Sequence, residues 1–343
     1  MSEGPDVWRM LLTDANEFHV PEEFREILRQ AGVHVESVDG HEPTAIAAAG
    51  ERCHGLFLYR ARVDDALLAA LPACRLLARV GTGYDAIDVE AARRRGVMVT
   101  YVPDFCTEEL SDHVMACILG FTRQFPFILS RARDHRWLTI AEVPVQRRLR
   151  GRTLGILGFG RSGQRTAEKA RAFGLDALAW TRTPRPADLA RAGARAATFE
   201  EALECAFVSL HLPLTEATHG LIGREALARM RPDAVLVNIA RGAIVDTDAL
   251  VDALRAGRLA GAALDVVQPA PLPPEHPLWS IPNVWITSHT GAISAEAADD
   301  AWSTVVEDVI RVRNGLPPAH AVPELRGEVI TTIEPGVLPP PGV

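Results

Sequence analysis

Short apolar segments alternate with amphipathic segments rich in Ala, Arg and Glu along almost the whole chain. In the first hundred residues this pattern predicts helices at 21–31, 43–49, 64–70 and 88–95, and strands at 7–13, 33–38, 55–59, 75–80 and 97–101. Strands that alternate with helices pair in parallel, and the helices then cover both faces of the sheet. The first part of the chain is therefore predicted to be an α/β domain.

The pattern changes between residues 107 and 152. Thr107 is followed by two glutamates and a leucine, which is typical of a capped helix start, and the apolar periodicity then runs on to residue 133. We expect one long helix over 107–133 that joins two domains. The polar, Arg-rich segment 134–152 is expected to be a connection.

A second α/β series begins at residue 153 and is followed by a helix at 294–314. Its expected strands are 153–158, 175–181, 205–211, 234–240, 260–266 and 284–288. Prolines dominate from Leu316 onward, so we expect an extended, poorly ordered tail there, with 326–343 as a separate Pro-rich segment. The fold class is α/β, and 343 residues suit about two domains.

Composition narrows the kinds of partner. The net charge of −8 argues against a nucleic acid, because phosphate backbones need a basic face. The five scattered cysteines form no C-x-x-C pair, which favours a reduced, cytoplasmic chain with mostly buried thiols; Cys106, near an expected cleft loop, is read as one of these. Neither a signal peptide nor a membrane span is expected, and no metal site is predicted.

The stretch RTLGILGFGRSGQRTAEKARAFG carries the first chemistry. An apolar strand runs into Gly158-x-Gly160-x-x-Gly163, and an Ala-rich helix then ends at Gly174. The first glycine permits a tight turn, the second lets backbone approach a pyrophosphate, and the third packs helix on strand. The helix N-terminus attracts the anion. We predict a Rossmann-like dinucleotide site at Gly158, Phe159, Gly160, Arg161, Ser162 and Gly163; the alternative is an ordinary Gly-rich turn.

The end of the next strand indicates which dinucleotide binds. In NAD enzymes an acidic residue usually stands there and bonds the ribose diol. Here Thr181 takes that place, followed by Arg182 and Thr183, with Arg185 beyond. A guanidinium can bind a 2′-phosphate bidentately and a hydroxyl can donate to it. NADP(H) is favoured over NAD(H), which stays possible; the alternative is that these arginines belong to a solvated loop.

With this loop, the chain from about residue 7 to 320 resembles the D-isomer-specific 2-hydroxyacid dehydrogenases, and within them the branch with the C-terminal-binding proteins and their bacterial relatives. The resemblance rests on several motifs in combination. They are RVGTGYDAIDVEAARRRGV (79–97), VPDFCTEELSDHVMACIL (102–119), LGFGRSG (157–163), HLPLT (211–215), NIARGAIVDTDAL (238–250), AGAALDVV (260–267) and SHTG (288–291).

The resemblance implies two Rossmann-like domains with doubly wound parallel sheets. A discontinuous substrate domain would comprise 1–105 and 294–325, and the dinucleotide domain 106–293. It further implies an active site in the interdomain cleft, where ligand sites of such sheets belong. The helix at 107–133 would carry much of a homodimer interface.

The implied reaction moves a hydride between the nicotinamide and a small 2-keto or 2-hydroxy acid of D configuration. Arg241, in NIARGAIVD, matches the family's arginine and would hold the substrate carboxylate; the alternative is an arginine that caps the sheet edge. His289, in SHTG, matches the acid/base, since imidazole titrates near neutrality. Both are predicted as catalytic, and His289 also contacts the cofactor.

The sequence departs from the family where a glutamate should pair with this histidine. The matching position is Ala270, and a nearby position that is often acidic is Gln268. A carboxylate beside an imidazole raises its pKa, so His289 should be a weaker base here. Three explanations are open: reduction with a lower pH optimum, replacement by a carboxylate such as Glu275 or Glu296, or modified or lost dehydrogenase activity. Both glutamates are otherwise simple surface charges.

Other positions receive roles from the resemblance. Asp265 would bond the nicotinamide carboxamide, and the remaining cofactor positions are His211, Pro213, Ala240 and Gly291. The expected substrate positions are Val80, Gly81, Thr82 and Gly83, whose amides would bind carboxylate, together with Arg60 and Arg241. Arg60 and Arg62 follow a first-domain strand and suit a second anionic group, such as a phosphate or phosphonate, or else are a solvated pair. Tyr84 and Phe105 are candidate pocket walls, and His113 is expected to be structural or interfacial.

The leading hypothesis is an NADPH-linked reductase of a small 2-keto acid. One alternative is a dinucleotide-sensing interaction protein, which the missing glutamate favours and Arg241 and His289 oppose. Another is a specialised biosynthetic enzyme with different chemistry on the same scaffold.

Overall fold

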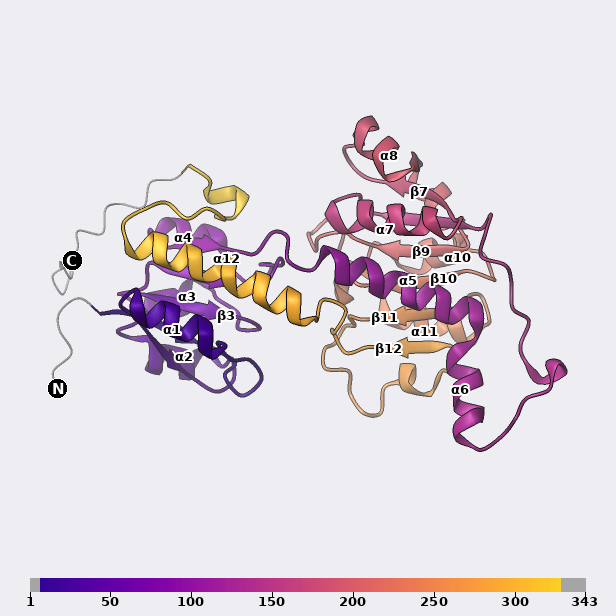
Figure 1. Ribbon diagram of the computed structural model, residues 1–343, viewed down its shortest axis with the longest axis horizontal. Helices are drawn as coiled ribbons and strands as arrows, with labels where there is room; N and C mark the ends of the chain where they lie inside the picture. Colours follow the sequence, from indigo (N-terminus) through magenta and orange to yellow (C-terminus); the bar gives the residue numbers. More distant parts are fainter. Residues whose placement is uncertain (1–6, 328–343) are drawn as a thin grey trace. The chain divides into compact units, whose positions relative to one another are not determined.

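The computed structural model describes residues 7–327, and the chain divides into two compact units (Figure 1). The first is formed by residues 7–105 with 294–327, and the second by 106–293. Each unit is built on its own parallel sheet with helices packed against it, so the predicted α/β class is confirmed. Of the predicted Pro-rich segment 326–343, residues 328–343 lie outside the described residues.

The sheet of the first unit has the strand order β2-β1-β3-β4-β5, with every pair parallel. Its strands are β1 (Trp8–Leu12), β2 (Val33–Ser37), β3 (Gly55–Leu58), β4 (Leu76–Arg79) and β5 (Met98–Thr100). The order reverses between β1 and β3, and ligands of such sheets bind beyond the carboxyl ends of the strands at that reversal. Residues just after β1 and β3 are therefore placed for recognition.

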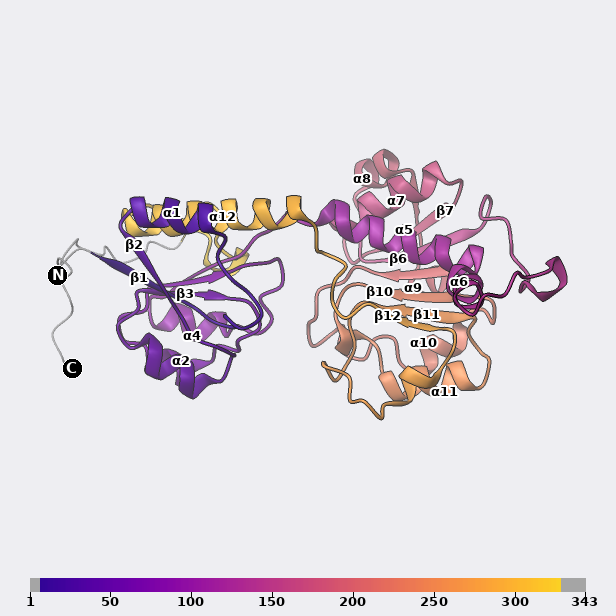
Figure 2. The same cartoon turned by 60° about the horizontal axis from the view of Figure 1, so that its bottom comes forward.

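Helices cover both faces of this sheet. Figure 2 shows α1 and α12 together on one face and α2 and α4 on the other. The helices are α1 (Glu22–Gln30), α2 (Pro43–Gly50), α3 (Asp65–Ala69), α4 (Val89–Arg94) and α12 (Ala295–Arg313). Because both faces are covered, β3 is buried at every position and reads as an uninterrupted apolar run. In the core, Trp302 of α12 packs against Phe57 of β3 in an edge-to-face arrangement.

The segment after α12 packs more tightly than its prolines predict. Val322 and Leu325 are buried, and the short 3-10 helix η4 spans Pro323–Leu325. The Val322 amide donates to the Val99 carbonyl of β5 at 3.0 Å. The buried carboxylate of Asp308 accepts the amide of Ala319 at 2.6 Å. The extended tail expected from residue 316 is thus wrong up to residue 327, because these apolar side chains belong to the first core.

The second unit holds a seven-stranded parallel sheet in the order β12-β11-β10-β9-β6-β7-β8. Its strands are β6 (Thr153–Leu157), β7 (Asp176–Trp180), β8 (Ala194–Ala196), β9 (Phe207–Leu210), β10 (Val235–Asn238), β11 (Gly261–Leu264) and β12 (Val284–Ile286). The order reverses between β6 and β9, as in dinucleotide-binding sheets. Only β8 was not predicted from the sequence; it is a three-residue strand at the sheet edge.

The helices that follow β6 in this unit have 5 to 12 residues. They are α7 (Arg161–Ala172), α8 (Pro186–Ala192), α9 (Phe199–Leu203), α10 (Arg224–Arg229) and α11 (Thr247–Arg255), with 3-10 turns η1 (Ile140–Glu142), η2 (Gly242–Ile244) and η3 (Pro277–Ser280). Nothing among residues 7–327 is both helical over sufficient length and apolar enough to cross a membrane. All five cysteines are buried, and none of them forms a disulfide.

The single helix expected over 107–133 is two helices, α5 (Thr107–Arg123) and α6 (Phe125–Arg133). They are separated by Gln124, which has φ 56° and ψ 32°, a left-handed conformation that ends α5. Pro126 then occupies the first turn of α6, where a missing amide proton costs nothing. A proline at that place predicts a new helix start, and the apolar periodicity across it concealed the break.

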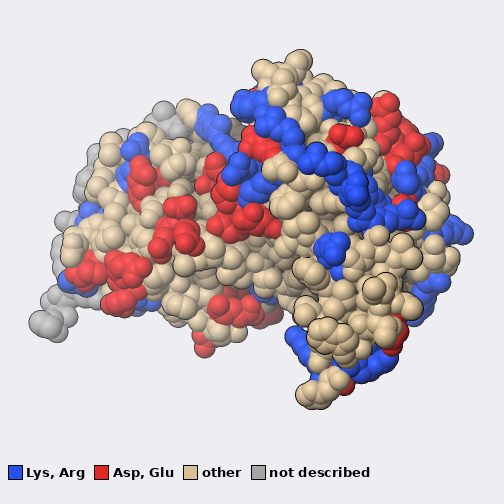
Figure 3. All heavy atoms as spheres, turned by 45° about the vertical axis from the view of Figure 1, so that its right-hand side comes forward, with Lys and Arg blue, Asp and Glu red and all other residues tan. Residues whose placement is uncertain are grey.

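The connection after α6 is mostly exposed. Arg147, Arg148 and Arg150 are exposed, while Arg152 donates to Asp233 at 3.0 Å. Figure 3 shows Lys and Arg side chains gathered in a band on one face of the second unit, with Asp and Glu side chains close to it.

Candidate active site

The glycine loop joins β6 to α7 at the point where the sheet order reverses. Gly158 has φ +96°, and a Cβ there would stand 2.6 Å from the carbonyl oxygen of His211. A Cβ on Gly163 would stand 2.4 Å from the carbonyl oxygen of Gly158. A Cβ on Gly160, in contrast, would meet nothing within 4 Å. The loop is therefore packed closely on its protein side and open at Gly160, as the approach of a pyrophosphate requires.

The N-terminus of α7 suits an anion. Gly160 is its N-cap and supplies no side chain to cap the first amides, and the first turn contains no acidic residue. Twelve residues of aligned peptide dipoles place partial positive charge at this end. Arg161 is exposed at the first helical position and adds to that charge. The residues present thus fit the predicted dinucleotide.

A neutral histidine supports the loop from the neighbouring strand. The ring of His211 lies between two hydroxyls, 3.1 Å from Ser162 Oγ at Nδ1 and 2.9 Å from Ser209 Oγ at Nε2. Burial lowers the pKa of His211 to about 3, so the ring is uncharged near neutrality. One ring nitrogen donates and the other accepts, which fixes the ring and anchors the start of α7. Pro213 lies exposed in the turn just beyond.

The residues predicted to choose the cofactor follow β7. The Gly158 amide donates to the Trp180 carbonyl at 2.9 Å, which places the end of β7 directly beside the glycine loop. Thr181 is half-buried, while Arg182 and Thr183 are exposed. No carboxylate occurs among residues 180–185. This end of the strand presents a hydroxyl and a guanidinium instead of an acidic side chain.

Arg241 is held at the carboxyl end of β10 by its neighbours. Asn238 is fully buried; its Oδ1 accepts the Ala240 amide and its Nδ2 donates to the Arg241 carbonyl, both at 3.0 Å. The Arg241 guanidinium donates to the Ala240 carbonyl at 2.8 Å. Gly242 follows, and a Cβ there would stand 2.1 Å from the carbonyl oxygen of Val267. The arginine is therefore positioned by Asn238, which we had not predicted as a site residue.

His289 lies in the loop after β12, which is organised by Asp265 at the end of β11. The Asp265 carboxylate is buried and accepts the amides of Thr290 at 2.8 Å and Gly291 at 3.1 Å. Its main-chain carbonyl accepts the His289 amide at 2.6 Å. Ser288 and His289 have φ of 54° and 60°, a region that residues other than glycine adopt rarely. Such backbone is often found at functional sites, and the His289 side chain is exposed.

The structure places no carboxylate at the position of the family's glutamate. Ala270 and Gln268 are both exposed in the loop between β11 and η3. The Gln268 carbonyl accepts the hydroxyl of Thr247 at 2.7 Å, which fastens this loop to α11. Glu275 is exposed in the same loop, and Glu296 is exposed in the first turn of α12, in the other unit.

In the first unit, the predicted anion-binding loop follows β4. The Val80 amide donates to Leu58 and the Gly81 amide to Arg79, so these two amides are used within the unit. Among residues 7–327, the amides of Thr82 and Gly83 have no acceptor, which makes them the candidates for a carboxylate. Arg79 shapes the loop, because its guanidinium donates to the Gly83 carbonyl at 2.8 Å and also to that of Val80.

Arg60 lies just after β3, at the reversal of the first sheet. Its guanidinium is 3.2 Å from Glu17 and 5.7 Å from the ring centre of Tyr59, which stacks on Phe18 at 4.7 Å. Arg62 is exposed two residues further on. The Arg60 guanidinium thus lies over a stacked aromatic pair at the carboxyl end of β3.

The candidate wall residues Tyr84 and Phe105 both have partners within the first unit. The Tyr84 hydroxyl donates to the Glu324 carboxylate at 3.2 Å, and burial with that carboxylate raises the pKa of Tyr84 to about 12. Tyr84 is therefore tied to η4. Phe105 is half-buried and packs against the core of the first unit.

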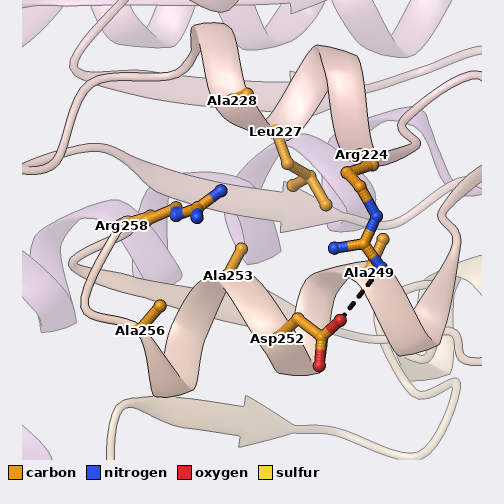
Figure 4. Close-up of a pocket in the computed structure, with 8 residues that line it drawn as sticks. All are labelled: Arg224, Leu227, Ala228, Ala249, Asp252, Ala253, Ala256 and Arg258. Atoms are coloured by element: carbon orange, nitrogen blue, oxygen red, sulfur yellow. Dashed lines mark hydrogen bonds and ion pairs between the residues drawn. The ribbon is translucent and has the colours of Figure 1, made fainter.

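A separate surface groove lies between α10 and α11 (Figure 4). Arg224 donates to Asp252 across it at 2.9 Å, and Arg258 faces it from the loop before β11. None of the predicted cofactor or substrate residues lines this groove. It is not the predicted site.

The fold and glycine loop define a dinucleotide-binding α/β protein, and the comparisons are more specific. Residues 115–291 match the D-isomer specific 2-hydroxyacid dehydrogenase, NAD binding domain. The chain is 38% identical over 279 residues to D-3-phosphoglycerate dehydrogenase of Mycobacterium leprae, covering 81% of this chain and 52% of that protein. It therefore spans about half the length of that relative.

Two further relatives are similar over nearly their whole length. The chain is 37% identical over 312 residues to glyoxylate reductase of Aeropyrum pernix, covering 88% of this chain and 92% of that one. The crystal structure of NADPH-dependent glyoxylate/hydroxypyruvate reductase from Sinorhizobium meliloti in complex with NADP and malonate superposes with a TM-score of 0.82 at 29% identity, over 92% and 97% of the two chains. The chain belongs to the D-isomer specific 2-hydroxyacid dehydrogenase family, as its motifs predicted.

Proposed function

We propose that the protein reduces a small 2-keto acid to the D-2-hydroxy acid with a nicotinamide cofactor. The observation that carries the proposal lies within the second unit. The open glycine loop follows β6, Arg241 follows β10, Asp265 follows β11 and the His289 loop follows β12. All four strands are parallel, so these features lie at the same carboxyl-terminal end of the sheet. Binding, charge compensation and proton transfer are thus available at one edge.

Each residue has a distinct task in this reaction. A bound reduced nicotinamide supplies the hydride. Arg241 binds the planar carboxylate of the keto acid and polarises the neighbouring carbonyl, and the Asn238 hydrogen bonds keep it directed. His289 in its protonated form gives a proton to the developing alkoxide, and takes one back in the oxidation direction.

NADPH is proposed as the preferred cofactor. The support is the exposed Arg182 and Thr183 beside the glycine loop, in place of an acidic residue. The test is kcat/KM for NADPH and NADH measured side by side. Arg182→Ala should lower kcat/KM for NADPH about ten- to a hundredfold, the loss of one charge-assisted hydrogen bond, and leave that for NADH within about twofold. A clear preference of the unaltered protein for NADH would refute the assignment.

The absent glutamate gives a proposal about pH. Without a carboxylate at position 270, we propose that His289 works as a weaker base and that reduction has a lower pH optimum. Ala270→Glu should then move the pH–rate profile of reduction to higher pH. An unchanged rate and profile would defeat this explanation. Glu275→Gln is the matched control: if Glu275 replaces the missing carboxylate, this variant alone loses most of its kcat.

The substrate is to be found with a panel that includes glyoxylate, hydroxypyruvate, pyruvate and phosphorylated or phosphonate analogues. Arg60 and Arg62 support a second anionic group on the substrate, although the ion pair with Glu17 offsets part of the charge of Arg60. If a phosphorylated acid is preferred, Arg60→Ala should raise its KM at least about tenfold and leave glyoxylate unaffected. Tight NADPH binding with no turnover of any acid would favour the dinucleotide sensor instead.

We also propose that the protein is a homodimer. Large apolar side chains are exposed on α6 and the following connection, where Trp137 and Ile140 are each 96% exposed. Phe125 and Leu129 of α6 are about half exposed. Several large apolar side chains exposed within one short stretch of the chain are typical of an interface. Light scattering should give twice the monomer mass, and Ile140→Glu should give the monomer. Trp279→Ser, at an exposed tryptophan on η3, is the control and should stay dimeric.

A further inference from the structure

Three side chains from separate elements of the second unit form a hydrogen-bonded chain. His113 of α5 lies with Nε2 3.1 Å from the Thr287 hydroxyl, just after β12. That hydroxyl lies 2.7 Å from Oδ1 of Asp265, just after β11. This series of hydrogen bonds therefore runs from the middle of a helix to the carboxylate that organises the His289 loop.

The donors in this chain can be assigned from chemistry. A carboxylate only accepts, so the Thr287 hydroxyl donates its single proton to Asp265. The same hydroxyl then accepts from His113, which must carry a proton on Nε2. The His113 ring also packs against the loop, because a Cβ on Gly291 would stand 3.3 Å from its Cγ and 2.9 Å from Asp265 Oδ2. His113 thus meets the loop both by contact and through Thr287.

The two oxygens of Asp265 are used unequally. Oδ1 accepts from the Thr287 hydroxyl and from the amides of Thr290 and Gly291, at 2.7, 2.8 and 3.1 Å. Oδ2 accepts only the Gly291 amide among the described residues, at 3.1 Å. A carboxylate has about four acceptor positions, so Oδ1 is filled and Oδ2 keeps one for a further donor. The Thr287 hydroxyl helps to decide which oxygen stays available.

The same carboxylate holds His289 in place. The His289 amide bonds to the Asp265 carbonyl at 2.6 Å, and the two amides that follow it bond to the Asp265 carboxylate. Between these anchors the chain takes the left-handed conformation at Ser288 and His289. A carboxylate free to rotate would release both amides, and the direction of the imidazole would change with them.

We propose that Thr287 and His113 are positioning residues: acting through Asp265, they hold the 288–291 loop in the conformation that presents His289 to the substrate. The inference rests on the proposed dehydrogenase function for its kinetic consequence. The hydrogen-bonded chain also makes a structural prediction that needs no turnover. That prediction concerns the amides of Thr290 and Gly291, which the Asp265 carboxylate accepts at 2.8 and 3.1 Å.

The test compares Thr287→Val, which removes the hydroxyl and keeps the shape, with Thr122→Val. The Thr122 hydroxyl is buried in α5 and donates only to the Ile118 carbonyl, so this control costs similar stability without touching the loop. Misplacing a catalytic group slightly costs up to about a hundredfold. Thr287→Val should lower kcat about ten- to a hundredfold, with KM for the keto acid and Kd for NADPH within about threefold.

Two further variants separate positioning from folding. Thr287→Ser keeps the hydroxyl and should restore kcat to within about threefold of the unaltered protein. His113→Phe keeps the ring contact and removes the donor, so its loss of kcat should be smaller than that of Thr287→Val. Equal losses in Thr287→Val and Thr122→Val would overturn the proposal, as would a serine variant no better than the valine variant.

Hydrogen exchange gives the readout that does not depend on activity. In Thr287→Val the amides of Thr290 and Gly291 should exchange at least about tenfold faster, measured by mass spectrometry on peptides that span 288–293, while Thr122→Val leaves them unchanged. If no keto acid is turned over by the unaltered protein, the proposed function fails and this exchange still decides the positioning role. Unchanged exchange in Thr287→Val would overturn it whatever the activity.

Discussion

A substitution at Gly160 should change the affinity for the cofactor without changing the stability of the fold. Its φ of −74° and ψ of −162° are open to any L-residue, and an added Cβ meets no atom within 4 Å. Gly160→Ala should therefore fold normally. Its free energy of unfolding should stay within about 1 kcal/mol of the unaltered protein, because alanine has fewer unfolded conformations to lose than glycine but is a poorer N-cap residue.

The same methyl group would stand where the pyrophosphate must approach the backbone. Displacing the pyrophosphate would weaken the charge-assisted hydrogen bonds from the first amides of α7, each of which contributes about 1.5–3 kcal/mol. Losing the equivalent of one or two gives about 3 kcal/mol, which is on the order of a hundredfold in Kd. Gly160→Ala is thus expected to bind NADPH about a hundred times more weakly at unchanged stability.

The matched variant is Gly163→Ala. Its Cβ would stand 2.4 Å from the Gly158 carbonyl oxygen, which is backbone and cannot turn away. Overpacking of this kind costs about 1–3 kcal/mol, so this variant should lose stability and affinity together. Kd comes from NADPH fluorescence titration and the free energy of unfolding from urea titration. If Gly160→Ala binds NADPH within about threefold of the unaltered protein, the assignment of the loop is wrong.

Three further results are expected. Asn238→Ala should cost about 1–3 kcal/mol of unfolding free energy, and lower kcat without changing Kd for NADPH, because Arg241 loses its support; an unchanged kcat would count against that role. Burial lowers the pKa of His211 from 6.5 to about 3, so the neutral ring contributes its full stability above pH 6.5. That contribution is lost as the pH falls from 6.5 toward 3, by at most about 1.4 kcal/mol per pH unit. In His211→Asn, the free energy of unfolding measured in urea should change less with pH over this range. Burial raises the pKa of Asp308 above 3.8, and the contact with His320 offsets only part of that shift. The unaltered protein should therefore gain stability relative to Asp308→Asn as the pH falls through the raised pKa. A stability difference between the two proteins that does not change with pH would contradict this.

Most of the regular structure could be predicted from periodicity, and the exceptions have identifiable causes. The break at Gln124 was missed because apolar side chains keep helical spacing across it, although Pro126 was a sufficient signal. The strand at 194–196 is short, lies at an edge, and has no apolar run to mark it. Residues 316–327 have the composition of a tail, and only the buried core contacts of Val322 and Leu325 show otherwise.

Only those residues of the candidate site that belong to a sequence motif could be predicted. The open space at Gly160 agrees with the role predicted for that glycine, while the roles of Arg241 and His289 stay predictions. The supporting residues could not be predicted, because they come from distant positions. His113 and Thr287 lie 174 residues apart, and no local pattern brings them together. Asn238 carried a weak signal, since a polar residue at the end of an otherwise apolar strand needs buried partners.

The division of the chain has a consequence for its synthesis. The second unit is one continuous segment, 106–293, whereas the core of the first unit includes Trp302, Val309 and Val322. At about 5–20 residues per second, roughly ten to forty seconds separate emergence of the first hundred residues from that of their closing helix. The part made first is thus the last to complete its core, and throughout that interval the apolar face that α12 will cover is available to chaperones or to aggregation.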